Sequence, residues 1–287
     1  MMFTEHESDV PDYEIIALKY ASRPALRTAN FGGGDPHDGP MPLDYYVWVV
    51  RNKETLFLID TGFAEDMAIK RHRTLHRTPM EALELLGITP ESVKDIVITH
   101  LHNDHIGTFD AYPNARFHLQ DSEVEFATGR HMACAVHSRP YEVDHVTGVV
   151  RLVYKDRVVF HDGEGLLAPG LSVHRIGGHT AGMQVVRVHT ARGWVVLASD
   201  ASHFYEHFMT RRFFPLVFHV GEVMQGYKLL HALTASEDHI IPGHDPLVMS
   251  LYPPVSKALE GIAVRLDLAP NASIAATLAA NLTANKR

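Results

Sequence analysis

Residues 98–107 are Ile98-Thr99-His100-Leu101-His102-Asn103-Asp104-His105-Ile106-Gly107. The apolar residues before His100 are typical of a buried strand, and the polar residues after it are typical of a loop. Alternate side chains of an extended chain point to the same side, so His100, His102 and Asp104 converge. A turn into a helix at about His105 brings that side chain toward the same space. A polar loop with chance histidines is the alternative, but four candidate ligands at this spacing favour a metal site.

Three later apolar runs each end in one polar side chain. His179 lies among glycines after a predicted strand, where the backbone can approach an ion closely. Asp200 follows the run Trp194–Ala198, and His244 follows Ile240-Ile241-Pro242-Gly243. Each of the three could be an ordinary loop residue on its own. Together with the first motif, they indicate one shared metal site.

The composition limits both the class of protein and the kind of ligand. The chain has 287 residues, of which 46% are hydrophobic, as in a water-soluble globular protein. Cys134 is the only cysteine, so the chain can form neither an intrachain disulfide nor a thiolate zinc cage, and any metal is held by nitrogen and oxygen. The 26 basic and 34 acidic residues give a net charge of −8, which argues against nucleic acid as a partner.

The distribution of apolar residues predicts no association with a membrane. No apolar stretch approaches the roughly 20 residues that span a bilayer. The first nine residues lack the positive flank and apolar run of a signal peptide, so we expect a cytoplasmic location.

The order of predicted elements favours a layered α/β protein. A capped helix is expected from Thr78 to Gly87 and another over 220–233. The predicted strands are 45–50, 55–59, 93–99, 151–160, 172–176, 184–189 and 194–198. We expect a single domain over 1–287, in which 1–44 is an N-terminal segment with a flexible glycine-rich flap and 270–287 is a terminal helix or a frayed tail.

The complete pattern resembles the metallo-β-lactamase superfamily. It consists of His100, His102, Asp104 and His105, then Gly178-His179-Thr180, Asp200 and Gly243-His244. The resemblance runs from about Asp60 to His244 and is strongest to the N-acyl homoserine lactonase group. It implies a four-layer αββα sandwich with two metal ions at the edge where the sheets meet. Carried over by position, one metal would be held by His100, His102 and His179, the other by Asp104, His105 and His244, with Asp200 bridging them.

The ligand types favour two divalent ions. Imidazole and carboxylate suit zinc, which we expect here, and they also suit iron, manganese or cobalt. Related di-iron redox proteins have a glutamate at the position of His102. The resemblance therefore implies that the neutral His102 favours hydrolysis over oxygen chemistry.

The activity that the resemblance implies is the opening of a lactone ring by a metal-bridging hydroxide. The substrate would be an N-acyl homoserine lactone or a related lactone, and the role would be quorum quenching. Asp104 would either pass a proton from the hydroxide to the leaving oxygen or serve as a ligand only. The lactonases usually have a tyrosine three positions after the bridging aspartate, where this chain has His203, with Tyr205 two residues later. Either His203 or Tyr205 would polarise the substrate carbonyl.

Aromatic residues are frequent after Asp200, namely Phe204, Phe208, Phe213, Phe214 and Phe218. They would form either core or an apolar pocket for a small hydrophobic lactone or ester. Exposed aromatic residues near the N-terminal loop would permit a homodimer. The rival functions on the same scaffold are a glyoxalase-type thioester hydrolase, a β-lactamase, a phosphodiesterase, a sulfur dioxygenase and a non-catalytic metal-binding scaffold.

Overall fold

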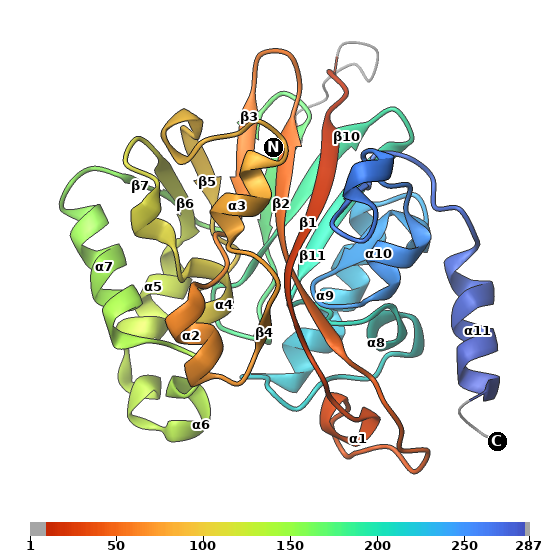
Figure 1. The fold of residues 1–287 in the computed structure, drawn as a ribbon. Coiled ribbons are helices and arrows are strands. Elements are labelled where there is room, and N and C mark those ends of the chain that lie inside the picture. The colour runs from red at the N-terminus through yellow and green to blue at the C-terminus, as the bar shows by residue number, and fades with distance from the viewer. Residues whose placement is uncertain (1–9, 285–287) are drawn as a thin grey trace.

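Two β-sheets stack face to face and carry helices on both outer faces (Figure 1). The computed structural model describes residues 10–284. The first nine residues of the predicted N-terminal segment and the last three of the predicted tail lie outside the described residues. The architecture is the expected αββα sandwich.

The first sheet has the strand order β13-β1-β2-β3-β5-β6-β7, with β4 paired to β1. Its strands are β1 (Glu14–Arg23), β2 (Leu43–Arg51), β3 (Leu56–Ile59), β4 (Thr74–Leu75), β5 (Asp95–Val97), β6 (Arg116–Gln120), β7 (Val158–His161) and β13 (Ala263–Arg265). From β3 to β7 the neighbouring strands are parallel, so their carboxyl ends meet at one edge.

The second sheet has the order β12-β11-β10-β9-β8. Its strands are β8 (Glu164–Ala168), β9 (Leu171–Arg175), β10 (Gln184–Thr190), β11 (Gly193–Ser199) and β12 (Ile240–Pro242). β11 and β12 are parallel, and their carboxyl ends lie at the same edge of this sheet.

Helices on the side of the first sheet are α2 (Glu65–Lys70), α3 (Pro79–Glu84), α4 (Asn103–Ile106), α5 (Asp121–Thr128), α6 (Ala135–Ser138) and α7 (Val143–Val153) (Figure 1). Helices on the side of the second sheet are α8 (Tyr205–Thr210), α9 (Val220–Leu233), α10 (Leu247–Leu251) and α11 (Ile274–Ala284). The four-residue α1 (Arg27–Asn30) precedes the glycine-rich loop. Short 3-10 helices are formed by Pro90–Ser92, Phe109–Ala111, Arg130–Ala133, Glu237–His239 and Lys257–Leu259.

The alternation of side chains along β2 explains the layers. Trp48 and Val50 point into the core that includes the second sheet, whereas Val47 and Val49 point into the core under α2, α3, α5 and α7. Successive side chains of a strand face opposite sides, so a strand that is apolar at every position is buried on both faces.

Most predicted elements are present, and the capped helix is confirmed in detail. The Thr78 side chain accepts a hydrogen bond from the backbone of Glu81, whose side chain accepts one from the backbone of Thr78. Gly87 ends this region with a φ of 70°, in the left-handed region that glycine adopts without strain. α9 spans the whole predicted range 220–233.

The structure differs from the predicted secondary structure in three places. The predicted strand over 151–160 is the end of α7 followed by β7, because Val149 and Leu152 have helical spacing and pack into the core. Residues 14–23, for which no element is predicted, form the long strand β1. The short helix after His102 begins at Asn103, two residues before the expected turn.

The predicted flexible flap is tied to the rest of the protein. The backbone amide of Gly32 donates to the carbonyl of Phe213 at 2.7 Å, and Asp35 forms ion pairs with Arg27 and Arg212. The aromatic residues Tyr13 and Phe31 are buried, so the described aromatics near this loop provide no exposed surface for a homodimer.

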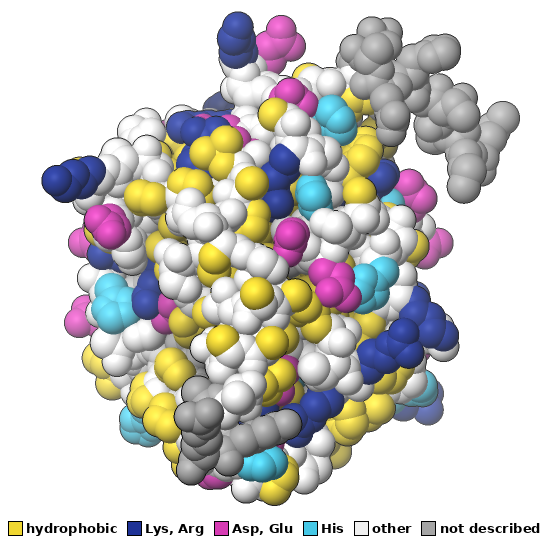
Figure 2. Space-filling view, turned by 90° about the vertical axis from the view of Figure 1, so that its right-hand side faces the viewer, with side chains coloured by type: hydrophobic (Ala, Val, Ile, Leu, Met, Phe, Trp, Pro, Cys, Tyr) yellow, Lys and Arg dark blue, Asp and Glu magenta, His cyan; other side chains and the backbone are white. Residues whose placement is uncertain are grey.

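Hydrophobic and charged side chains are both present on the surface. The face toward α10 and α11 has hydrophobic side chains interspersed with charged ones (Figure 2). Among residues 10–284, every helix is too short or too polar to cross a membrane.

Candidate metal centre

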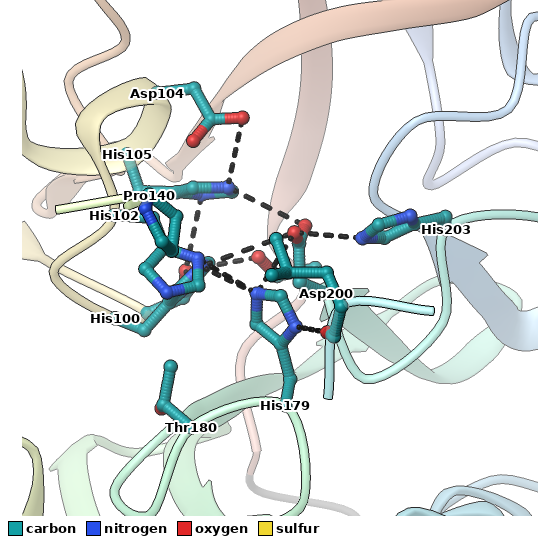
Figure 3. A network of polar contacts seen from close by, with 12 residues as sticks. His100, His102, Asp104, His105, Pro140, His179, Thr180, Asp200 and His203 are labelled. Atoms are coloured by element: carbon teal, nitrogen blue, oxygen red, sulfur yellow. Dashed lines mark hydrogen bonds and ion pairs between the residues drawn. The ribbon is translucent and has the colours of Figure 1, made fainter. Parts of the chain in front are cut away.

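Strand ends bring the candidate ligands to one edge of the sandwich. β5 leads into the loop that starts at His100, and β9 leads into the loop that carries His179. The parallel pairing of Ser199 in β11 with Pro242 in β12 places the residues after them, Asp200 and His244, side by side. Side chains more than a hundred positions apart in sequence therefore meet in one buried cluster (Figure 3).

His100, His102 and His179 form the first group of donor atoms. The Nε2 atom of His179 lies 3.2 Å from Nε2 of His100 and 2.9 Å from Nδ1 of His102. His179 donates its Nδ1 proton to the carbonyl of Leu216 at 2.7 Å, which leaves a lone pair on Nε2. Burial lowers the pKa of His179 to about 4 and holds the pKa values of the other two histidines well below the ordinary range. Neutral imidazole nitrogens that converge in this way suit a shared cation.

Asp104, His105 and His244 form the second group. The Oδ2 atom of Asp104 lies 3.8 Å from Nε2 of His105 and 3.9 Å from Nε2 of His244. The outer nitrogen of His244 donates to the carbonyl of Asp44 at 2.8 Å, so its inner nitrogen faces the group. The outer nitrogen of His105 is 2.7 Å from the carboxylate of Asp60. These outer hydrogen bonds orient both rings toward one point.

Asp200 lies between the two groups with one carboxylate oxygen toward each. Its Oδ2 atom is 3.4 Å from Nε2 of His179, and its Oδ1 atom is 3.0 Å from Nε2 of His244 and 3.4 Å from Nε2 of His105. Oδ1 of Asp200 and Nε2 of His105 are buried without a hydrogen-bond partner. Buried polar atoms are rarely left unsatisfied, so this pair of atoms fits a site that receives a metal ion.

The charges of the cluster are coupled through Asp200. Burial raises the pKa of Asp200, but His244, His203 and His105 outweigh it and hold the pKa well below the usual range. Burial lowers the pKa of His244, whereas the negative charge of Asp200 outweighs it and raises the pKa. The carboxylate therefore remains ionised at neutral pH, as a metal ligand must be.

Comparison with known proteins identifies the family. The model of the Metallo-beta-lactamase superfamily matches residues 41–244, which include all the candidate ligands. This chain belongs to the metallo-β-lactamase superfamily.

Several relatives of this superfamily member are named as lactonases. The N-acyl homoserine lactonase AiiB of Agrobacterium fabrum is 36% identical over 128 residues, 43% of this chain and 45% of that protein. An N-acyl homoserine lactonase of a Bacillus species is 29% identical over 184 residues, 58% of this chain and 68% of that protein. The chain thus spans less than half the length of the AiiB relative.

Solved structures with the same fold include lactonases. A quorum-quenching N-acyl homoserine lactone lactonase superposes with a TM-score of 0.68 at 20% identity, covering 83% of this chain and 95% of that chain. AidC, described as a dizinc quorum-quenching lactonase in complex with a product, superposes with a TM-score of 0.65 at 17% identity, covering 83% and 89%. At these identities the likeness establishes the fold.

His203 and Tyr205 occupy different places in this metallo-β-lactamase fold. The Nε2 atom of His203 lies 2.9 Å from Oδ2 of Asp200, and its side chain lines the cavity in front of the cluster. Tyr205 is fully buried in the hydrophobic core and is not among the cavity-lining residues. The reason is local: Tyr205 begins α8, and its backbone amide donates to the carboxylate of Asp245, which turns the ring into the core. The alternative role for Tyr205 therefore lacks access to substrate.

Two buried carboxylates support the cluster, and sequence reasoning missed both. Asp60 accepts hydrogen bonds from the backbone amide and the hydroxyl of Thr99 and also contacts His105. It ends β3 as Asp200 ends β11, so the same signal could have found it. Glu123 accepts hydrogen bonds from the amide of Leu101 and the hydroxyl of Thr180, and so joins the two histidine loops. It lies in α5, where nothing in the local sequence distinguishes it from a surface acid.

A cavity of about 740 Å³ opens onto the cluster. Asp104, Asp200, His102, His203 and His244 lie in its wall. Its apolar wall is formed by Leu43, Tyr45, Phe214, Pro215 and Leu216. This volume is within the range of small-molecule sites. The aromatic stretch after Asp200 is thus divided, since Phe204 and Phe208 are core while Phe214 borders the cavity.

Proposed function

We propose that this protein is a dinuclear metal-dependent hydrolase that opens the ring of an N-acyl homoserine lactone or a related lactone. The observation that carries the proposal is the position of Asp200, whose two oxygens face two separate groups of donor atoms. The names of the relatives supply the substrate class. The whole chain would act as one hydrolase domain.

The proposed ligands are the residues of the buried cluster. The first ion would be held by His100, His102 and His179, the second by Asp104, His105 and His244, and Asp200 would contact both. Zinc is the proposed metal, since nitrogen and carboxylate ligands suit it, with iron, manganese and cobalt as alternatives. Two such ions, when bound, supply an activated water at neutral pH and polarise a carbonyl oxygen.

The chain's own residues would orient the substrate and move a proton. Asp104 has a side chain that is 19% exposed, so it can reach a reacting group in the cavity. We assign it the transfer of the proton that the attacking water gives up to the leaving ring oxygen. His203 would turn its ring N–H from Asp200 toward the substrate carbonyl oxygen as negative charge develops there. Leu43, Phe214 and Leu216 would contact the acyl part of a hydrophobic substrate.

The biological setting follows as part of the proposal. A lactonase with this substrate would have a quorum-quenching role, and we propose a cytoplasmic location. A homodimer stays a proposal that would need another surface, because the described aromatic residues near the glycine-rich loop are buried, and light scattering of the purified protein measures it.

Metal analysis combined with a panel of substrates tests the function. We expect two zinc ions per chain and release of acid from N-acyl homoserine lactones. His102→Ala should lose one metal and the activity, whereas His76→Ala, an exposed histidine hydrogen-bonded to Ser22, should keep both. Cleavage of a thioester, a phosphodiester or a β-lactam without lactone opening would overturn the proposal. Two bound metals without turnover of any ester would instead indicate a metal-binding scaffold.

A further inference from the structure

The cavity wall is rich in positive charge, although the chain as a whole has a net charge of −8. Beside the metal cluster and the apolar wall, the cavity is lined by Arg23, Lys70, Arg71, His72, Arg73 and Arg139. The lactone ring and acyl chain of the proposed substrate class carry no charge that would require such a wall. The lactone ring and its acyl chain therefore do not explain why so many cationic side chains line the cavity.

Only part of this positive charge is neutralised by the protein. Lys70 and Arg71 share the carboxylate of Glu142, with Lys70 at 2.7 Å. Within residues 10–284, Arg23, Arg73 and Arg139 have no carboxylate partner. The acidic residues that line the cavity, Asp104 and Asp200, belong to the metal cluster.

Arg23 and Arg73 lie at the end of the short pairing between β1 and β4 and line the same cavity. The antiparallel register pairs Ser22 with Thr74, and Arg23, the last residue of β1, and Arg73, the residue before β4, are the next positions in that register. Like charges directly opposite across a strand pair are destabilising. The Nε atom of Arg23 is moreover buried without a hydrogen-bond partner. An anion held between the two guanidinium groups would reduce the repulsion between their charges and give the Nε atom of Arg23 a hydrogen-bond acceptor.

The position of this pair relates it to the metal cluster. The Cζ atom of Arg73 lies 5.6 Å from the centre of the Tyr45 ring, and that ring lies 4.9 Å from the ring of His244 in an edge-on contact. One aromatic ring thus lies between Arg73 and a candidate metal ligand. A group bound by the arginines would belong to the distant end of a molecule whose reacting bond lies at the cluster.

We propose that Arg23 and Arg73 form a subsite for a carboxylate at the end of the substrate remote from the lactone. Guanidinium groups present paired donors that match a carboxylate, and a partly buried pair binds it more strongly than an exposed one. This inference rests on the proposed lactonase function and narrows its substrate class to lactones with an anionic acyl end. Tyr45 and Leu43, which line the cavity, would pack along the connecting chain of the substrate.

Two matched lactones test the subsite. Adipoyl homoserine lactone ends in a carboxylate, and its terminal carboxamide has the same length and shape without the charge. We expect the zinc-loaded protein to open the carboxylate form with a kcat/KM at least about ten times higher. Raising the salt concentration should increase KM for the carboxylate form and leave KM for the carboxamide unchanged, because salt screens only the charged interaction.

Variants of the pair locate the effect. Arg23→Gln and Arg73→Gln should each lower kcat/KM for the carboxylate form by about tenfold and change it less than twofold for the carboxamide. Arg151→Gln, which removes an exposed arginine on α7 outside the cavity, is the matched control and should change neither. Equal activity of the wild type on both lactones, or variants that lose as much kcat/KM on the carboxamide as on the carboxylate form, would overturn the subsite while leaving the lactonase function in place.

Failure of the proposed function gives a different result. If neither lactone is opened, calorimetry on the same protein compares their dissociation constants. Tighter binding of the carboxylate form that is lost in Arg23→Gln would keep the anion subsite although the reaction was misassigned. Equal binding of the two compounds would reject the subsite as well.

Discussion

The Nε2 atom of His203 lies 2.9 Å from Oδ2 of Asp200, the same oxygen that faces His179. The His203 ring also stacks on Phe214, with 3.6 Å between ring centroids and an angle of 21° between the planes. Both contacts place the imidazole at the wall of the cavity. His203 therefore connects the carboxylate at the centre of the cluster with the space that a substrate would occupy.

Replacing His203 tests its role as a donor. His203→Ala should lower kcat/KM for lactones by about 100-fold or more, as expected for the loss of one donor to the oxygen on which negative charge develops. Both metals should stay bound, because His203 is not needed to complete either group of donor atoms. Steady-state kinetics and metal analysis of the same preparation measure the two effects.

Tyr205→Phe is the matched control for this prediction. The phenol is buried in the core, so its removal should change kcat/KM less than twofold. A large loss of activity in Tyr205→Phe together with full activity in His203→Ala would show that Tyr205, and not His203, is the donor to the substrate carbonyl.

Asp60→Asn should weaken the second metal site. Asp60 has a φ of 59°, a conformation that asparagine adopts readily, so the backbone should be retained. The substitution removes the negative charge 2.7 Å from Nδ1 of His105. Loss of such a support costs about 10–100-fold in metal affinity. Competition with a chelator should release one metal per chain earlier than from the wild type. Asp95→Asn, a carboxylate that pairs with Arg116 instead, should release both metals as the wild type does.

The sequence carried a strong signal for the site because the candidate ligands follow apolar runs. A buried strand is readable as a run of Val, Ile and Leu, and the polar residue that ends it marks the edge of a sheet. This holds for Asp200 and His244, which the pairing of β11 with β12 brings together. An apolar run does not show where the side chains after it point, so the sequence could not decide between His203 and Tyr205 as the donor to the substrate. In the structure, His203 lines the cavity and Tyr205 lies in the core.

Other features depend on contacts that a linear pattern does not contain. Leu152 and Val153 lie at the end of α7, and the packing of Leu152 into the core outweighs their strand propensity. Glu123 has no local signature, since its importance comes from Thr180 and Leu101, which lie far from it in the chain. The arginine pair also appears only when β1 and β4 are aligned.

Glu206→Gln should destabilise the fold through the loop of residues 31–40. The Arg27 guanidinium donates to both oxygens of Glu206, at 2.8 and 2.7 Å, and both side chains are buried. Asp35 alone would then neutralise Arg27 and Arg212, so one positive charge of this network is left uncompensated, which costs about 3 kcal/mol. Urea unfolding measures this loss. Arg116→Gln, which breaks a pair with a 60% exposed arginine, should cost about 1 kcal/mol or less. Equal losses in the two variants would show that the Arg27 pair contributes no more than a surface pair.

Asp35 should make the stability of the protein depend on acid pH. Burial raises the pKa of Asp35, but hydrogen bonds from Arg212 and Arg27 outweigh it and hold the pKa well below the ordinary value. A carboxyl group whose pKa is lowered in the folded state contributes its full stabilisation above the unfolded-state pKa of about 3.9. The protein loses this contribution as the pH falls further.

Asp35→Asn lacks the titrating group. The difference in unfolding free energy between wild type and variant should therefore be constant from pH 7 to pH 5 and shrink as the pH falls below about 4. Urea unfolding of both proteins at each pH measures it. A difference that stays the same down to the lowest pH at which both proteins fold would mean that Asp35 is not held ionised by the two arginines.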